Sequence, residues 1–229
     1  MLKCQFHTHA QGDGHHYIPY TPKQLINRAA KLGYDVLAIT SHEKILFNKG
    51  LKKYAEKKGI LLIPGVEHEI YKKHIVCLNT DSSIHKANTF EKLRKYKADH
   101  PECLIFAPHP FFPTEKPLKK YLVENPDIFE AIEYSFSYTK THNPYNKRAV
   151  EFAKTHKKPI LATADCHFLN DLDIGFTYVN SKKDTQSIFT AIRQNKLKIK
   201  TQPTTYFHIF KFMVTQTIRD ISKIFYKNR

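Results

Sequence analysis

Histidine and carboxylate side chains are concentrated near the start of the sequence, in QFHTHAQGDGHH at positions 5–16. This stretch contains His7, His9, Asp13, His15 and His16. Histidine is the commonest metal ligand in proteins, and divalent ions held by histidine and carboxylate groups can activate water for hydrolysis. Residues two apart in a strand point the same way, so His7 and His9 would project together. The stretch is either a metal site or a histidine-rich polar loop, and further ligands elsewhere in the sequence would distinguish the two.

Other apolar, strand-like runs also end in possible metal ligands. DVLAITSH ends in His42, LLIPGVE in Glu67, CLIFAPH in His109, and PILATADCH in Asp165 and His167. In α/β barrels, side chains at the carboxyl ends of the strands form the active site. Five strands with such ends, two of them carrying ligand pairs at the strand period, favour one shared metal site over a set of unrelated surface loops.

The remaining histidines lack this placement. We expect them at the surface or beside the site: His15, His16, His68, His85, His100, His142, His156 and His208.

Strand-like and helix-like segments alternate along most of the chain. TPKQLINRAAKLG has the signals of a helix, with Thr21 as N-cap, Pro22 in the first turn and Gly33 as a stop. About seven β–α units follow one another, and YKKHIVCLN is expected to pair with ILLIPGVEHEI as a hairpin. This pattern predicts an α/β fold with a mainly parallel sheet, as a closed or nearly closed barrel rather than an open doubly wound sheet. No glycine-rich dinucleotide loop follows any strand.

The composition narrows the function classes. The chain has 229 residues, 37 Lys+Arg and 21 Asp+Glu, and so a formal net charge of +16. Such a charge attracts phosphorylated or nucleic-acid partners, although lysine spread along the whole chain also fits a generally lysine-rich protein. No apolar run reaches the roughly 18 residues of a membrane span, and no signal-peptide core is present. Cysteines in apolar stretches without a C-x-x-C pair indicate reduced thiols, so we expect a cytoplasmic protein.

Several of these stretches resemble motifs of the PHP (polymerase and histidinol phosphatase) superfamily of metal-dependent phosphoesterases, from about residue 3 to residue 200. FHTHAQGDG is similar to that family's H-x-H followed by Asp-Gly, and YTPKQLINRAAKLGYDVLAITSH to its first helix and Thr-Asp-His strand end. IPGVEHEI resembles its Gly-x-Glu strand, KHIVCLN the next strand, APHP its His-Pro and ATADCH its Ser-Asp-x-His. The resemblance implies a distorted (β/α)7, TIM-like barrel over residues 1–200 that binds three metal ions at its C-terminal face.

The resemblance also implies nine ligands, all present here. The first ion would take His7, His9, Glu67 and Asp165. The second would share Glu67 as a bridge and add His74 and His109, and the third would take Asp13, His42 and His167. His68, next to Glu67, competes with His74 for the second set.

Three positions depart from the family pattern. Ser41 replaces an Asp, Ala164 replaces a Ser, and Cys166 occupies the variable position between Asp165 and His167. None of these changes removes a ligand, but Ser41 and Ala164 reduce the support around the ligands.

Imidazole mixed with carboxylate suits Mn, Zn or Fe better than Ca. We therefore expect metal-dependent hydrolysis of a phosphoester, with Glu67, Asp165 and His167 as the catalytic residues. The substrate would be a phosphorylated small molecule, a nucleotide or an oligonucleotide. A metal-dependent amidohydrolase, which needs only one or two ions, and a non-catalytic barrel that binds nucleic acid are the alternatives.

The last segment, residues 201–229, lies beyond the resemblance. An amphipathic helix is predicted there, because apolar residues recur at steps of three and four: Phe207, Phe210, Val214, Ile218, Ile221 and Phe225. From Lys211 to Arg229 the segment has five basic residues and one acidic residue, Asp220. The helix would either pack on the barrel or contact an anionic lipid surface or a partner.

Overall fold

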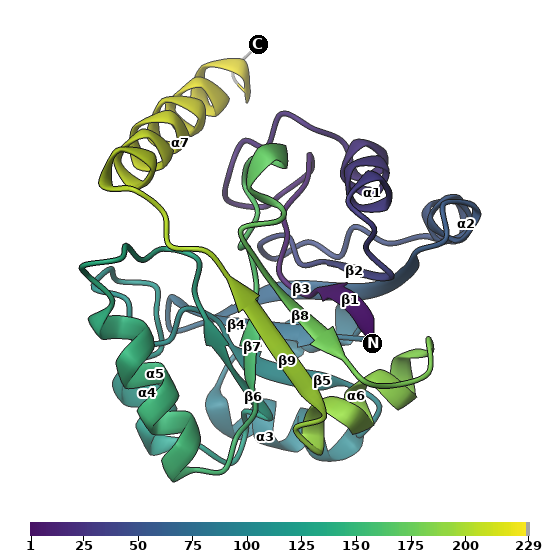
Figure 1. The fold of residues 1–229 in the computed structure, drawn as a ribbon, viewed down its shortest axis with the longest axis vertical. Helices are drawn as coiled ribbons and strands as arrows, with labels where there is room; N and C mark the ends of the chain where they lie inside the picture. Colours follow the sequence, from purple (N-terminus) through teal and green to yellow (C-terminus); the bar gives the residue numbers. More distant parts are fainter. Residues whose placement is uncertain (228–229) are drawn as a thin grey trace.

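The computed structural model describes the backbone of residues 1–227 and the side chains of residues 1–221. Phe225 and the basic side chains after position 221, which form part of the predicted C-terminal face, therefore lie outside the described residues. The order of elements along the chain is that of an α/β protein (Figure 1).

Within residues 1–227 the strands are β1 (Leu2–Gln5), β2 (Val36–Ile39), β3 (Leu61–Ile70), β4 (Lys73–Leu78), β5 (Leu104–Ala107), β6 (Ala131–Tyr134), β7 (Ile160–Ala162), β8 (Gly175–Val179) and β9 (Leu197–Thr201). The α-helices are α1 (Pro22–Lys31), α2 (Lys49–Lys57), α3 (Phe90–Asp99), α4 (Lys120–Glu124), α5 (Pro144–Thr155), α6 (Thr185–Arg193) and α7 (Tyr206–Lys227). Two short 3₁₀ helices complete the list, η1 (Ser82–Lys86) and η2 (Leu169–Asp171).

The strands form one sheet in the order β7-β6-β5-β4-β3-β2-β1-β8-β9. β1–β2–β3 and β5–β6–β7 are parallel runs, whereas β4 is antiparallel to both of its neighbours, as the predicted hairpin requires. The hydroxyl of Thr177 in β8 bonds the backbone of Ala162 in β7, and Thr8 bridges Cys166, so the two ends of the sheet approach each other. The predicted, nearly closed α/β barrel is confirmed, with β8 and β9 as strands that the sequence patterns did not predict.

Local sequence signals explain the first two helices. Thr21 caps α1 in a capping box with Gln24, and Pro22 occupies its first turn, as predicted. α2 begins one residue after Asn48, whose side-chain oxygen accepts the backbone N–H of Leu51. These two helices lie together on one side of the sheet (Figure 1). Because β1 and β2 are parallel, the loops that follow them begin at the same end of the barrel.

A buried apolar core supports the strands. Phe6, Phe106 and Phe189 are fully buried members of a cluster that joins residues of β2, β4, β5, β6 and β7 to α6. Close packing of this kind leaves the strand ends little freedom to move. The side chains that follow these strands are therefore presented from a rigid scaffold.

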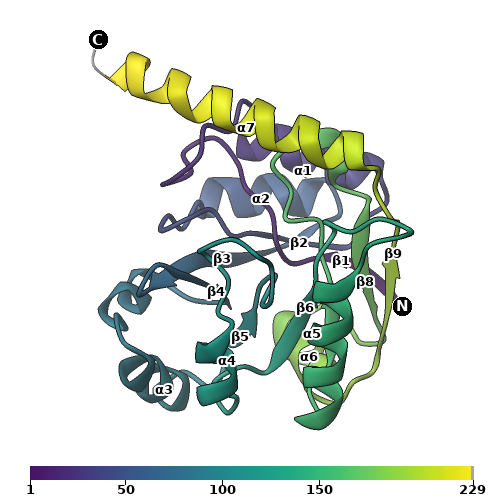
Figure 2. The same ribbon diagram turned by 90° about the vertical axis from the view of Figure 1, so that its left-hand side faces the viewer.

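The predicted C-terminal helix exists, and it lies across one end of the barrel (Figure 2). Its inward side carries Phe212, Gln216 and Asp220, which are partly or fully buried. Its outward side is apolar and exposed: Tyr206, Phe207, Phe210, Met213, Val214, Ile218 and Ile221 are between 40% and 73% exposed. Among the described residues, no helix combines the length and the apolar character needed to cross a bilayer.

Candidate metal centre

The structure brings the predicted ligands together at the end of the barrel where the parallel strands finish. His7 and His9 follow β1, His42 follows β2, and Glu67 lies within β3. His109 follows β5, and Asp165 and His167 follow β7. His74 lies near the start of β4, and because β4 runs antiparallel its start is at the same edge. All of these residues except Asp165 and His109 are at most 5% exposed.

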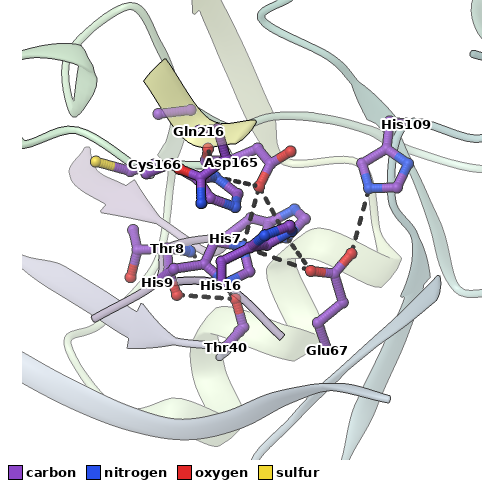
Figure 3. Close-up of polar contacts among 12 residues, drawn as sticks. His7, Thr8, His9, His16, Thr40, Glu67, His109, Asp165, Cys166 and Gln216 are labelled. Carbon is purple, nitrogen blue, oxygen red and sulfur yellow. Dashed lines mark hydrogen bonds and ion pairs between the residues drawn. The ribbon is translucent and has the colours of Figure 1, made fainter. Parts of the chain in front are cut away.

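Glu67 is at the middle of the cluster, and its two carboxylate oxygens face different sets of histidines (Figure 3). Oε2 lies near the Nε2 atoms of His7, His9 and His42, at 3.1, 3.4 and 3.0 Å. Oε1 lies 2.8 Å from His74 Nδ1 and 3.2 Å from His109 Nε2. This arrangement is what a carboxylate that bridges two ions requires.

Asp165 closes the first predicted set. Its Oδ1 atom is 3.0 Å from His9 Nε2 and 3.4 Å from His7 Nε2. The ligand atoms of His7, His9, Glu67 and Asp165 all lie within 4.8 Å of one another, and so do those of Glu67, His74 and His109. Asp165 and His109 both have positive φ angles, 42° and 30°, which are strained for residues other than glycine and are typical of functional positions.

Two buried carboxylates orient the histidine rings. Glu133 Oε1 accepts a hydrogen bond from His7 Nδ1 at 2.9 Å, and Asp13 Oδ2 accepts one from His9 Nδ1 at 2.9 Å. Each bond occupies Nδ1 of its ring and directs Nε2 at Glu67 or Asp165. Carboxylates that hold metal-binding histidines in this way are a regular feature of metal sites.

Asp13, the carboxylate predicted for the third set, also faces histidines. Both of its oxygens accept hydrogen bonds, from the rings of His9 and His42 and from the backbone N–H groups of His15, His16 and His42. The third group of converging ligand atoms consists of His9, His42 and His167. Asp13 therefore contacts two histidines of this third group, His9 and His42.

His74 supplies a separate indication that cations belong here. Both of its ring nitrogens are buried and lack a hydrogen-bond partner, although Nδ1 is only 2.8 Å from Glu67 Oε1. A buried polar atom without a partner is costly, and such a group needs an explanation. A metal ion shared by the ring nitrogen and the carboxylate supplies one, so the residues fit the divalent ions that the resemblance implies.

The electrostatics keep Glu67, Asp165 and His74 in forms that can bind metal. Burial alone would raise the pKa of Glu67, but the facing rings of His74, His42 and His7 hold it well below its ordinary value. Burial would also raise the pKa of Asp165, but His7 and His167 hold that pKa well below its ordinary value. Burial is the main cause that lowers the pKa of His74, to about 4, so this imidazole is neutral near pH 7.

His42 behaves differently from His74. Burial lowers its pKa, but Glu67 and Asp13 outweigh that and raise it to about 10. A metal ion that binds His42 must therefore displace a proton.

Sequence reasoning missed Glu133, which bonds His7 in this centre, whereas His15 and His16 were expected at the surface or beside the site. Glu133 had no motif, and its only signal was a charged residue within the apolar strand AIEYSFS. His15 stacks on His42 with ring centroids 4.8 Å apart, and His16 lies 4.9 Å from His42 and 5.1 Å from His167.

His68 is the competitor that the structure separates from the centre. Neighbouring strand residues face opposite sides, so it points away from Glu67 and bonds Glu43 and the carbonyl oxygen of Ala87. Ser41, which replaces the usual Asp, bonds the backbone N–H of Ala10.

Helix α7 covers the mouth of the centre. The ring of Phe212 lies 5.5 Å from that of His167, and Arg219 stacks over Phe168 at 4.2 Å. Asp220 bonds His16 and the backbone N–H of Tyr17, which ties the helix to the loop after β1. Gln216 lies above Asp165 in Figure 3, with its Oε1 atom buried and unpartnered.

No family model and no curated protein sequence matches this chain, but solved structures do. PsfC from Pseudomonas syringae PB-5123 is 15% identical, with a TM-score of 0.64 over 96% of this chain and 98% of PsfC. A candidate metal-dependent phosphoesterase from Bifidobacterium adolescentis is 14% identical, with a TM-score of 0.55 over 72% of this chain and 87% of its own. The lesion-specific endonuclease PfuEndoQ from Pyrococcus furiosus is 17% identical, with a TM-score of 0.59 over 86% of this chain and 57% of the endonuclease.

An amidohydrolase from Chromobacterium violaceum is similar as well, at 16% identity and a TM-score of 0.53 over 72% of this chain and 87% of its own. At these identities the comparisons establish the architecture. The fold of these structures is shared by this chain, as a nearly closed α/β barrel.

Proposed function

We propose that this protein is a metal-dependent phosphoesterase that uses three divalent ions, of Mn, Zn or Fe. The observation that carries the proposal is Glu67, whose two oxygens address separate histidine sets from one buried carboxylate. Similarity in fold to a phosphoesterase and an endonuclease supports the same reaction class.

The proposed ligand sets follow the converging atoms. His7, His9, Glu67 and Asp165 would hold one ion, and Glu67 with His74 and His109 a second. His42 and His167 would hold the third, with Asp13 fixing the His42 ring. When bound, such ions lower the pKa of a coordinated water and neutralise charge on the phosphoryl oxygens.

The side chains of the protein would hold the ions in place and keep bulk water out of the centre. The ring of His167 bonds the backbone carbonyl oxygen of Asp165 through Nδ1, which leaves Nε2 available for an ion or for the proton of the leaving group. Glu67 and Asp165 stay ionised because the surrounding imidazoles lower their pKa values against the effect of burial. The ring of Phe212 beside His167 keeps bulk water from that side of the centre.

The substrate of the proposed reaction is a phosphorylated small molecule, a nucleotide or an oligonucleotide. Endonuclease Q has been solved with a 27-mer duplex that carries an abasic lesion at its active site, but this chain covers only 56% of that protein. In this chain α7 lies over the mouth through Phe212 and Gln216, and this favours a narrow substrate over a duplex.

A substrate panel tests the proposal. Purified protein loaded with Mn²⁺ is assayed with phosphomonoesters, nucleoside bisphosphates, short single-stranded oligonucleotides and simple amides. We expect metal-dependent release of phosphate or of shortened oligonucleotides, abolished by chelation and by Glu67→Gln. Turnover of amides alone would support the amidohydrolase alternative. An amidohydrolase is among the proteins with a similar fold. Binding of nucleic acid without turnover of any ester would support the non-catalytic barrel.

The cytoplasmic location expected from the sequence belongs to the same proposal. The four cysteines are buried and unpaired, which fits a reducing compartment.

We also propose that α7 contacts an anionic lipid surface through its outward side. That side exposes Phe207 and Phe210 at 73% and 64%, whereas the one acidic residue of the segment, Asp220, is turned inward to His16. Apolar and aromatic side chains on a basic segment are typical of helices that lie in a membrane interface. A second copy of the chain is a poorer occupant, because each copy has a net charge of +16.

Vesicle co-sedimentation tests this contact. The protein should bind vesicles of phosphatidylcholine mixed with phosphatidylserine, bind plain phosphatidylcholine weakly, and release with salt. Burial of one Phe contributes about 1.5–3 kcal/mol, so the double change Phe207→Ser and Phe210→Ser should weaken binding by at least about 100-fold. The matched control changes two exposed apolar residues of other helices, Val123→Ser and Val150→Ser. Equal binding by both variants, or a dimer that only the α7 variant loses, would refute the lipid contact.

A further inference from the structure

Three potential ligands lie on the opposite side of β3 from the metal centre. They are Glu43, just after β2, His68 in β3, and His85 in η1. One ligand atom from each lies within 4.8 Å of the other two. None of the three is assigned a role by the proposed phosphoesterase site.

The hydrogen bonds around His68 show why a cation fits between these groups. His68 Nε2 lies 3.1 Å from the carbonyl oxygen of Ala87 and must donate its proton there. In the neutral ring Nδ1 then has only a lone pair, yet it faces Glu43 Oε1 at 2.9 Å. A lone pair and a carboxylate oxygen at this distance need a positive charge between them, which either an added proton or a metal ion can supply.

The second histidine approaches the other oxygen of the same carboxylate. His85 Nδ1 lies 3.1 Å from Glu43 Oε2, and the His85 side chain is partly exposed. Two atoms that are each about 2.1 Å from one tetrahedral ion lie roughly 3.4 Å apart. Both measured separations are a few tenths of an ångström shorter, so small movements of the side chains would let one ion contact the carboxylate and both imidazoles.

The surroundings provide access and a rigid base. Glu43 and His85 line an open cleft of about 790 Å³, which leaves room for water to complete the coordination. Glu43 has a φ angle of +51°, and its backbone N–H bonds the carbonyl oxygen of Glu67 at 3.0 Å. A strained, firmly anchored backbone at a residue other than glycine is typical of a functional position.

We propose that Glu43, His68 and His85 bind a divalent transition-metal ion, with Zn²⁺ as the best fit to a site of two histidines and one carboxylate. The ion would connect the end of β2, the middle of β3 and η1. Since Glu43 and His68 follow directly after His42 and Glu67, it would also stiffen the backbone that carries two ligands of the catalytic centre.

Equilibrium dialysis at a fixed, micromolar free Zn²⁺ concentration tests the site. His85→Ala should hold close to one Zn²⁺ fewer per chain than the unaltered protein, and should gain less thermal stability from Zn²⁺. His85 is partly exposed, so this variant keeps the fold, and Glu43→Gln is a second variant of nearly the same shape. Both should retain activity with Mn²⁺, because neither residue lies in the catalytic centre.

The matched control is His100→Ala. His100 also faces a carboxylate at 3.0 Å, that of Glu102, but belongs to no group of three converging ligands among the described residues. Its Zn²⁺ content should equal that of the unaltered protein. Unchanged Zn²⁺ content in His85→Ala and Glu43→Gln would overturn the proposal, whatever the activity of the protein. A loss of Zn²⁺ that His100→Ala reproduces would do the same.

Discussion

Replacing Glu133 by Gln tests whether a carboxylate outside the ligand sets controls metal binding. Glu133 accepts hydrogen bonds from His7 Nδ1, from the backbone N–H of His109 and from the hydroxyl of Thr163. An amide keeps one acceptor oxygen and turns the other into a donor. A Gln side chain can therefore serve His7 and Thr163, or His109, but not both sides.

The magnitude follows from that lost acceptor. A buried donor without a partner costs about 1–3 kcal/mol, and loss of a carboxylate that orients a metal-binding histidine weakens metal affinity or activity by about 10–100-fold. We expect Glu133→Gln to raise the Mn²⁺ concentration that gives half-maximal hydrolysis by about 10–100-fold. Activity at saturating Mn²⁺ should recover in part, because all of the ligands remain.

The control for this prediction is Glu130→Gln, just before the same strand. Glu130 bonds Arg193 at 2.6 Å and the backbone N–H of Ile105 at 3.1 Å, and it touches none of the proposed ligands. The Glu130→Gln substitution should lower the melting temperature of the protein without changing the Mn²⁺ concentration that gives half-maximal hydrolysis. If Glu133→Gln lowered stability but left the Mn²⁺ requirement unchanged, the orienting role assigned to Glu133 would be wrong.

Further outcomes follow from the same geometry. Glu67→Gln should reduce kcat/KM by more than about 100-fold, beyond the range of changes outside the ligand sets, and retention of a tenth of the activity would exclude a bridging role. Metal analysis of Mn²⁺- or Zn²⁺-loaded His85→Ala protein should find close to three ions per chain, and fewer than two would exclude a trinuclear centre. Hydrolysis should rise with pH up to about 7–8 as a metal-bound water ionises, and a profile flat from acid to alkali would contradict that step. The metal-free protein should be most stable near pH 6.5. The raised pKa of His42, about 10, gives stability that is complete below the unfolded value of about 6.5 and is lost as pH rises. The lowered pKa values of His74 and Asp165 give stability that is lost as pH falls, and a scan of melting temperature against pH would reveal any other optimum.

The sequence could predict the barrel and the convergence of its strand ends because both depend on local periodicity. Apolar runs ending in His42, Glu67 or Asp165 are visible without any tertiary information, and parallel strands bring such ends to one edge. The alternation of side chains along a strand also argues against His68 as a ligand, because residues 67 and 68 face opposite sides of β3. His74, in β4, does not have this restriction.

What could not be predicted depends on contacts between distant parts of the chain. Glu133 reaches His7 across 126 positions, and no local pattern distinguishes it from other strand residues. The outward direction of the apolar side of α7 runs against the usual rule that such a side packs inward, so periodicity predicted the helix but not its orientation.

The hairpin between β3 and β4 has a consequence for how this centre tolerates insertions. Its loop has only two residues, Tyr71 and Lys72, both with positive φ angles, and it sets Glu69 opposite His74. Because strand side chains alternate with a period of two, one residue added to this loop would rotate His74 out of the centre and bring a neighbour in, with every ligand still present in the sequence. The length of an exposed turn is therefore as strict a requirement for metal binding as the identity of a ligand, and a search for functional relatives should compare spacing across this turn as well as the histidines themselves.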